Sequence, residues 1–117
     1  MHAKQTAAEM RFSVGVSTLA DSQRAVEDVC QQAMAPLGGK VDLALAFISP
    51  HHGDDLRPLA SEIINRTGTG CLLGCSGESI VAGTREIEGQ PAISLWLASM
   101  PGVAVDCAHL EYLATPE

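Results

Sequence analysis

The segment "DLALAFIS", Asp42 to Ser49, is apolar at almost every position. A strand buried on only one face alternates apolar and polar residues, whereas a strand covered on both faces, as in a parallel sheet, is apolar almost throughout. We therefore expect this segment to be a covered strand of a largely parallel sheet.

Strands and helices alternate on either side of this segment. "FSVGVS", Phe12 to Ser17, predicts a strand before it, and "CLLGC", Cys71 to Cys75, predicts a strand after it. Apolar residues recur at helical spacing within residues 21–39 and 54–66. Helices of this length connect parallel strands through right-handed crossovers, so the chain is predicted to begin βαβαβ.

Residues with known preferences for helix ends mark both helices. Asp21 or Ser22 can cap the start of the first helix, and Gly38 or Gly39 can end it. Gly68 is the expected end of the second helix.

Beyond Gly77 the pattern changes, because no further helix follows. Residues 79–87 are expected to be extended, and residues 88–91 carry a turn signal. Residues 92–100 predict a strong strand, and the alternating residues 103–113 predict a final one. We therefore expect a three-layer α/β fold with a mixed, mostly parallel sheet, which begins βαβαβ and ends in a β-meander.

The length and composition fit one compact domain. The chain has 117 residues, of which 46% are hydrophobic and 18% charged. We assign residues 1–11 to a flexible N-terminal arm and residues 12–117 to a single α/β domain. The formal charge of -7 without a basic run argues against nucleic acid as a partner. No stretch approaches the ~18 apolar residues of a membrane span.

The cysteines and the first residues bear on the compartment. The chain has four cysteines, Cys30, Cys71, Cys75 and Cys107, and none forms a CxxC pair. We expect small buried thiols in a reducing compartment. Residues 1–10 lack the apolar stretch of a signal peptide, so a cytoplasmic location is expected.

Topology nominates one edge of the sheet as the ligand site. In open α/β sheets, ligands bind outside the C-terminal ends of the strands, where residues 17–21, 49–55 and 75–79 should converge. Two aspartates at the second helix start, Asp54 and Asp55, favour a zwitterion or a neutral polar ligand over a phosphate. The candidate ligand-binding residues are Ser17, Ser49, His51, His52, Cys75, Ser76, Gly77 and Glu78.

A nucleophile at Cys75 or Ser76 is the alternative to a binding site. The run "GCSGE" misses the G-x-S-x-G nucleophile pattern, because Glu78 stands where the last glycine is required. A histidine of the neighbouring loop can approach Cys75, but a small residue packed at a tight turn explains this cysteine better. We expect no catalytic residue.

Metal and nucleotide sites find little support. Residues 51–55, "HHGDD", resemble a metal site in composition, but adjacent histidines on an extended loop point apart. Neither a Walker A run nor G-x-G-x-x-G is present. We predict no cofactor and no metal. Glu78 either caps nearby amides or binds the amine or hydroxyl of a ligand, and both interpretations stay open.

Several segments together resemble one family. They are "VGVS", "DSQRAVEDVCQQA", "DLALAFISP", "AISLWLASMPG" and above all "CLLGCSGESIVAG". They resemble the N-terminal part of a FIST domain, a sensory domain of bacterial signalling proteins. The family's run of glycine, cysteine, serine or threonine, a small residue and glutamate corresponds to Gly74, Cys75, Ser76, Gly77 and Glu78.

The resemblance implies a sensory function. The family is associated with sensing of small ligands, amino acids among them, and it brings no catalytic residue. It also implies a partner in a C-terminal FIST half or a signalling output domain, which can supply a second wall of the pocket. A free sheet edge can pair with a second copy. We therefore expect a small-ligand-binding sensory domain, with a thiol or serine enzyme and a structural interaction module as alternatives.

Overall fold

The computed structural model describes residues 9–115. The predicted arm therefore lies largely outside the described residues, although its last residue, Arg11, begins a strand. The elements are β1 (Arg11–Ser17), α1 (Ser22–Leu37), β2 (Leu43–Ile48), the 3-10 turn η1 (Pro50–His52), α2 (Arg57–Thr67), β3 (Leu72–Ser76), β4 (Ser79–Ala82), β5 (Arg85–Glu88) and β6 (Ile93–Ser99).

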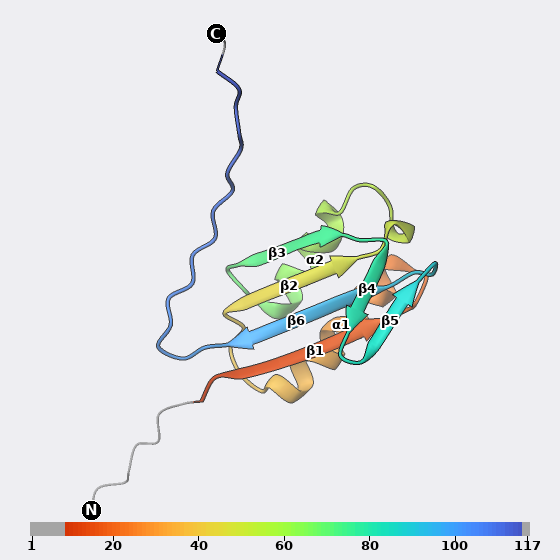
Figure 1. Ribbon diagram of the computed structural model, residues 1–117. Coiled ribbons are helices and arrows are strands. Elements are labelled where there is room, and N and C mark those ends of the chain that lie inside the picture. The colour runs from red at the N-terminus through yellow and green to blue at the C-terminus, as the bar shows by residue number, and fades with distance from the viewer. Residues whose placement is uncertain (1–8, 116–117) are drawn as a thin grey trace, which may run out of the picture.

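The main sheet has four strands in the order β1-β6-β2-β3 (Figure 1). β1 and β2 are both antiparallel to β6, and β3 is parallel to β2. β1, β2 and β3 therefore run in the same direction, and their C-terminal ends share one edge. The predicted α/β class with a mixed sheet is confirmed. Only one of the three strand pairings is parallel, because β6 is inserted between β1 and β2 and runs antiparallel to both.

The layers are unequal in extent. α1 packs on β1, β6 and α2, so both helices cover one face of the sheet (Figure 1). The β4–β5 hairpin lies over one end of the opposite face, where Ile80 and Ile87 pack with Val16. Within residues 9–115, nothing covers the remainder of that face. β2 is consequently not covered on both faces along its whole length, and Phe47 is 39% exposed.

The core lies between the helices and the sheet. Val29 and Leu37 of α1, Ile63 of α2, and Leu95 and Leu97 of β6 are all essentially inaccessible to solvent. Burying each such side chain stabilises the fold by about 1.5–3 kcal/mol. This layer therefore fixes the sheet edge at which the candidate loops emerge.

The helix ends agree with the residues that predicted them. The Asp21 carboxylate accepts a hydrogen bond from Arg24 N at 2.9 Å. Gly38 ends α1 and Gly68 ends α2, both in the left-handed conformation that glycine adopts without strain. α2 begins later than expected, and the Asp55 carboxylate accepts from its first amide.

The predicted last strand is wrong. Residues 103–113 form no strand, although their alternation of apolar and polar residues fits one. β6 already has a partner on each side, and within residues 9–115 this segment pairs with neither β1 nor β3, the two outer strands. Leu110 and Tyr112 are 89% and 93% exposed. Alternating apolar and polar residues form a strand only where a neighbouring strand is available to pair with them.

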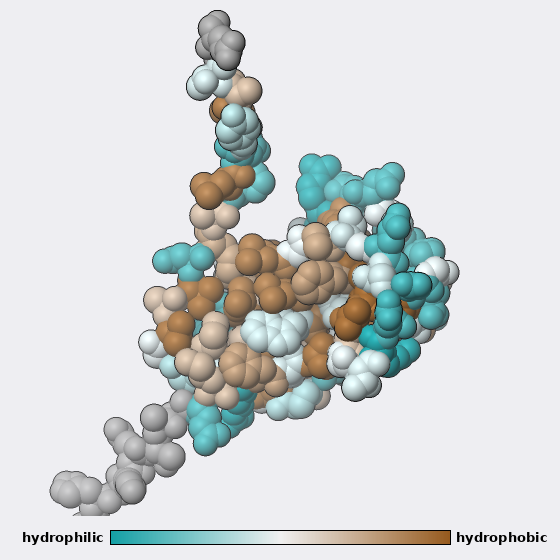
Figure 2. Space-filling view, viewed as in Figure 1, coloured by the Kyte–Doolittle hydropathy of each residue, from teal (hydrophilic) through white to brown (hydrophobic). Residues whose placement is uncertain are grey.

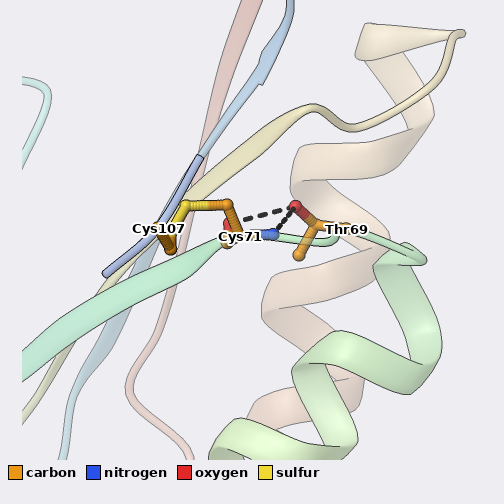
Figure 3. The surroundings of a disulfide bond; sticks show 3 residues. All are labelled: Thr69, Cys71 and Cys107. Carbon is orange, nitrogen blue, oxygen red and sulfur yellow. Dashed lines mark hydrogen bonds between the residues drawn. A yellow bond between two sulfur atoms is a disulfide. The ribbon is translucent and has the colours of Figure 1, made fainter. Parts of the chain in front are cut away.

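The expectation of four free thiols is also wrong. Cys71 and Cys107 form a disulfide bond, with their Cα atoms 5.6 Å apart (Figure 3). The Thr69 hydroxyl donates to Cys71 O at 3.0 Å and accepts from Cys71 N at 3.2 Å, which fixes the start of β3. Cys30 is free and buried, and Cys75 is free and exposed. Within residues 9–115, neither helix has the length and apolar content needed to cross a bilayer.

Candidate functional site

The loops that follow β1, β2 and β3 emerge at the common C-terminal edge of the sheet, as the topology predicts (Figure 1). The predicted residues in these loops do not form one site. They divide into buried residues that hold the loops, residues that line a hollow, and residues at the outer edge of β3.

Two of the predicted serines are structural. Ser17 and Ser49 are only 2% and 1% exposed. The Ser17 hydroxyl accepts from Leu19 N at 3.3 Å, and the Ser49 hydroxyl accepts from Ala92 N at 2.9 Å. These bonds hold the loop after β1 and tie the loop after β2 to the start of β6. Neither hydroxyl is accessible to a ligand.

His52 is buried in the same region. The residue is 7% exposed, and its Nδ1 lies 2.9 Å from the hydroxyl oxygen of Ser22 in the first turn of α1. Burial, with a smaller effect of His51, lowers the pKa of His52. Among the described residues, Nε2 of this ring has no hydrogen-bond partner. The two adjacent histidines bind different serines, because His51 Nδ1 lies 3.3 Å from Ser49 Oγ.

A hollow of about 460 Å³ lies between the loop after β2 and the base of the hairpin. It contains two of the predicted ligand-binding residues, His51 and Glu78, with Ser79, the last residue of the predicted third loop, and Glu88, which was not predicted. The full lining is Pro50, His51, Glu78, Ser79, Glu88 and Gly89.

The hairpin register explains why Glu88 is present. Ser79 of β4 pairs directly with Glu88 of β5, so Glu88 lies at the base of the hairpin, where it lines the same hollow as Glu78. Gly83, in the left-handed conformation, turns the chain between the two strands. The sequence carried a signal for this arrangement, because two short extended runs around a glycine are typical of a hairpin.

The hollow has an acidic character. Two carboxylates line it, and no lysine or arginine does. Within residues 9–115, neither Glu78 nor Glu88 takes part in an ion pair. The Ser79 hydroxyl donates to Glu86 at 3.4 Å, and the His51 imidazole lies on the opposite wall. Such a lining suits a ligand that carries an ammonium group and further polar groups.

The remaining predicted residues lie elsewhere. Gly77 N donates to Ile48 O at 3.0 Å, which joins the end of β3 to β2. Cys75 borders a separate groove of about 500 Å³ between α2 and the outer edge of β3. In the described part of the chain, no histidine or carboxylate is hydrogen-bonded to Cys75 or Ser76. His109 also lines this groove, but its Nε2 lies 3.1 Å from Glu111 Oε1, so within the described residues it is paired with that carboxylate and not with Cys75.

The side chains that could bind a metal ion are not clustered in the described residues. Within the described residues, no group of three or more histidine, cysteine, aspartate or glutamate side chains is placed to hold an ion.

Comparison with known proteins identifies one family. Residues 42–112 match the FIST N domain. Uncharacterized proteins from two strains of Mycobacterium tuberculosis and one from Mycobacterium bovis are each 36% identical over 107 residues, which is 91% of this chain and 27% of theirs. The chain therefore spans about a quarter of the length of these relatives. No solved structure matches it.

Proposed function

Because this chain belongs to the FIST N domain family, a family of sensory domains in signal transduction, we propose that it binds a small polar ligand with an amino group, such as an amino acid. The ligand occupies the hollow between His51, Glu78 and Glu88. The domain acts without catalysis and passes the binding event to a C-terminal FIST half or an output domain.

One observation supports this proposal above all. Glu78 and Glu88 line the same hollow, and its lining includes no lysine or arginine. Two carboxylates that form no ion pair within residues 9–115 favour a cation, and an ammonium group can donate to both. His51 Nε2 and the acceptor positions of the Ser79 hydroxyl oxygen remain for the ligand's other polar groups, since His51 Nδ1 faces Ser49 Oγ and the Ser79 hydroxyl donates to Glu86. The volume of about 460 Å³ falls within the range of small-molecule sites.

The position of the hollow suggests how binding is signalled. Its two walls come from different elements, the loop after β2 and the β4–β5 hairpin. A ligand that binds both walls holds the hairpin against the main sheet. Binding therefore changes the freedom of a surface element that a neighbouring domain can contact.

Ligand titration of the whole chain tests the proposal. A panel of amino acids and other small amines is screened by thermal shift, and hits are measured by calorimetry. We expect Glu78→Gln and Glu88→Gln each to weaken a hit by about tenfold or more, since a charged hydrogen bond is lost. Asp106→Asn, which makes the same charge change at an exposed position outside the hollow, should leave the affinity unchanged. A panel without any hit would overturn the proposal.

A cytoplasmic location stays a prediction, and the disulfide bond between Cys71 and Cys107 is the observation that argues against it. Disulfides are rare in reducing compartments. Trapping thiols in intact cells with an alkylating reagent decides the matter, because in a reducing cytoplasm both cysteines should be alkylated.

A further inference from the structure

The face of the main sheet opposite the helices is apolar from one outer strand to the other. The strand register places Val14, Trp96, Leu45 and Leu73 in one row across β1, β6, β2 and β3. Val14 and Leu73, at the two ends of the row, are 46% and 50% exposed. Apolar side chains thus continue across all four strands.

Parallel rows extend the surface on both sides, and none carries a charge. We call the three rows together the open face. They consist of Phe12, Ala98 and Leu43, then Val14, Trp96, Leu45 and Leu73, and then Val16, Ser94, Phe47 and Cys75. Figure 2 shows this face from the front, with brown and tan hydrophobic residues over the strands around paler ones at its centre.

A solvent-facing sheet surface normally carries polar side chains at alternate positions, which this face does not. A contiguous apolar patch of this kind marks an interaction surface. With strands about 4.8 Å apart and rows about 6.8 Å apart, the open face measures about 400 Å² in plan. A standard interface between separate chains buries about 800 Å² per partner. The plan area understates the accessible area of the same patch, but the face is still small, and a layer joined to it covalently loses less entropy on docking than a separate chain does.

The hairpin indicates the nature of that layer. β4 and β5 form a two-stranded sheet of their own, and they already lie over one end of the open face, where Ile80 packs with Val16 (Figure 1). Two isolated strands are marginally stable, and sheets commonly gain further strands. Strands added beside this hairpin would extend across Trp96 and Leu45.

The relatives contain the chain that such a layer requires. This chain covers only 27% of their length. The segment that leaves the domain is held to β3 by the bond from Cys71 to Cys107, but beyond it Leu110 and Tyr112 are 89% and 93% exposed and yet lie within the matched region. It runs away from the sheet in Figure 1.

We propose that strands from the part of a FIST protein outside the matched region extend the β4–β5 sheet over the open face. The two sheets then pack face to face, about 10 Å apart, with α1 and α2 on the outside. This surface is distinct from the hollow, so the inference does not depend on ligand binding.

The test compares the 117-residue chain with a chimera in which it replaces the matched region of the Mycobacterium tuberculosis relative. Leu73→Cys reports on the open face, and Val81→Cys, 63% exposed on the outward side of the hairpin, is the matched control. Both are made in a Cys75→Ser background. Alkylation rates are read by mass spectrometry on the peptide that holds the introduced cysteine.

We expect alkylation at residue 73 to be slower in the chimera than in the isolated chain by about tenfold or more, with little change at residue 81. Equal rates at residue 73 in the two proteins would overturn the proposal. A chimera that does not fold, when the chain and the relative both fold, would also count against it, since the open face would then fail to accept the layer.

A second measurement tests whether the open face binds a second copy of the chain. We expect sedimentation of the isolated chain to show a monomer across a wide dilution series. A dimer that Leu73→Lys dissociates and Val81→Lys does not would assign the open face to a second copy and overturn the proposal.

Discussion

Ser22 Oγ and His52 Nδ1 lie 2.9 Å apart, so the first turn of α1 is joined to the loop that follows β2. His52 is only 7% exposed, and its burial lowers the pKa of the imidazole. The contact holds the loop after β2 in place, and the residue before His52 in this loop, His51, lines the hollow. Protonation of a buried ring should therefore affect both the stability and the site.

The first prediction concerns pH. Because the pKa of His52 is lower in the folded chain than its ordinary value of about 6.5, the unfolded chain binds this proton more tightly. The contribution of His52 is complete above about pH 6.5 and is lost as the pH falls toward the folded pKa, at up to about 1.4 kcal/mol per pH unit. Urea unfolding between about pH 7.5 and about pH 5.5 measures the loss. His52→Asn should show a shallower pH dependence, and an identical slope in both proteins would contradict the prediction.

The second prediction concerns the close contact of α1 with β1. A Cβ atom added at Gly15 would lie 2.7 Å from Val29 O and 3.0 Å from Gln32 Cβ. We expect Gly15→Ala to lower the free energy of unfolding by about 1–3 kcal/mol, as overpacking does. Gly70→Ala is the control, since nothing lies within 4 Å of its added Cβ. Equal stability of the two variants in chemical denaturation would show that α1 does not approach β1 so closely.

The third prediction concerns the two free thiols. Burial raises the pKa of Cys30 to about 11, against a smaller opposite effect of Arg66, while Cys75 is exposed. The thiolate is the reactive form, so a disulfide reagent at neutral pH should modify one thiol per chain rapidly. Cys75→Ser should abolish this phase, and Cys30→Ser should leave it intact. The reverse pattern would mean that the exposures are misassigned.

The fourth prediction concerns the disulfide bond. Cys71 and Cys107 are 36 residues apart, but residues 103–115 form no regular element. In the folded state the bond also restrains the segment between the end of β6 and Cys107, which is otherwise free to move. The entropy lost there offsets part of the stabilisation that the bond gives by restricting the unfolded chain. We expect Cys107→Ser to cost no more than about 1–2 kcal/mol and to speed proteolysis after residue 102. A loss comparable with global unfolding would show that the segment contributes to the core.

The sequence determined the elements whose causes are local. Asp21, Gly38 and Gly68 marked the helix ends correctly, since capping depends on a few neighbouring residues. Strand positions followed from apolar runs for the same reason. The sequence also placed His51 and Glu78 at one edge of the sheet, because parallel strands bring their C-terminal loops together.

Contacts between distant residues were decided only by the tertiary structure. The position of β6 between β1 and β2, the bond from Cys71 to Cys107 and the packing of both helices on one face all join segments that no local pattern relates. The hairpin register brought Glu88 beside Ser79 and completed the hollow. An apolar strand residue looks the same in sequence whether a layer covers it or not, so the open face around Trp96 became visible only once the chain had folded.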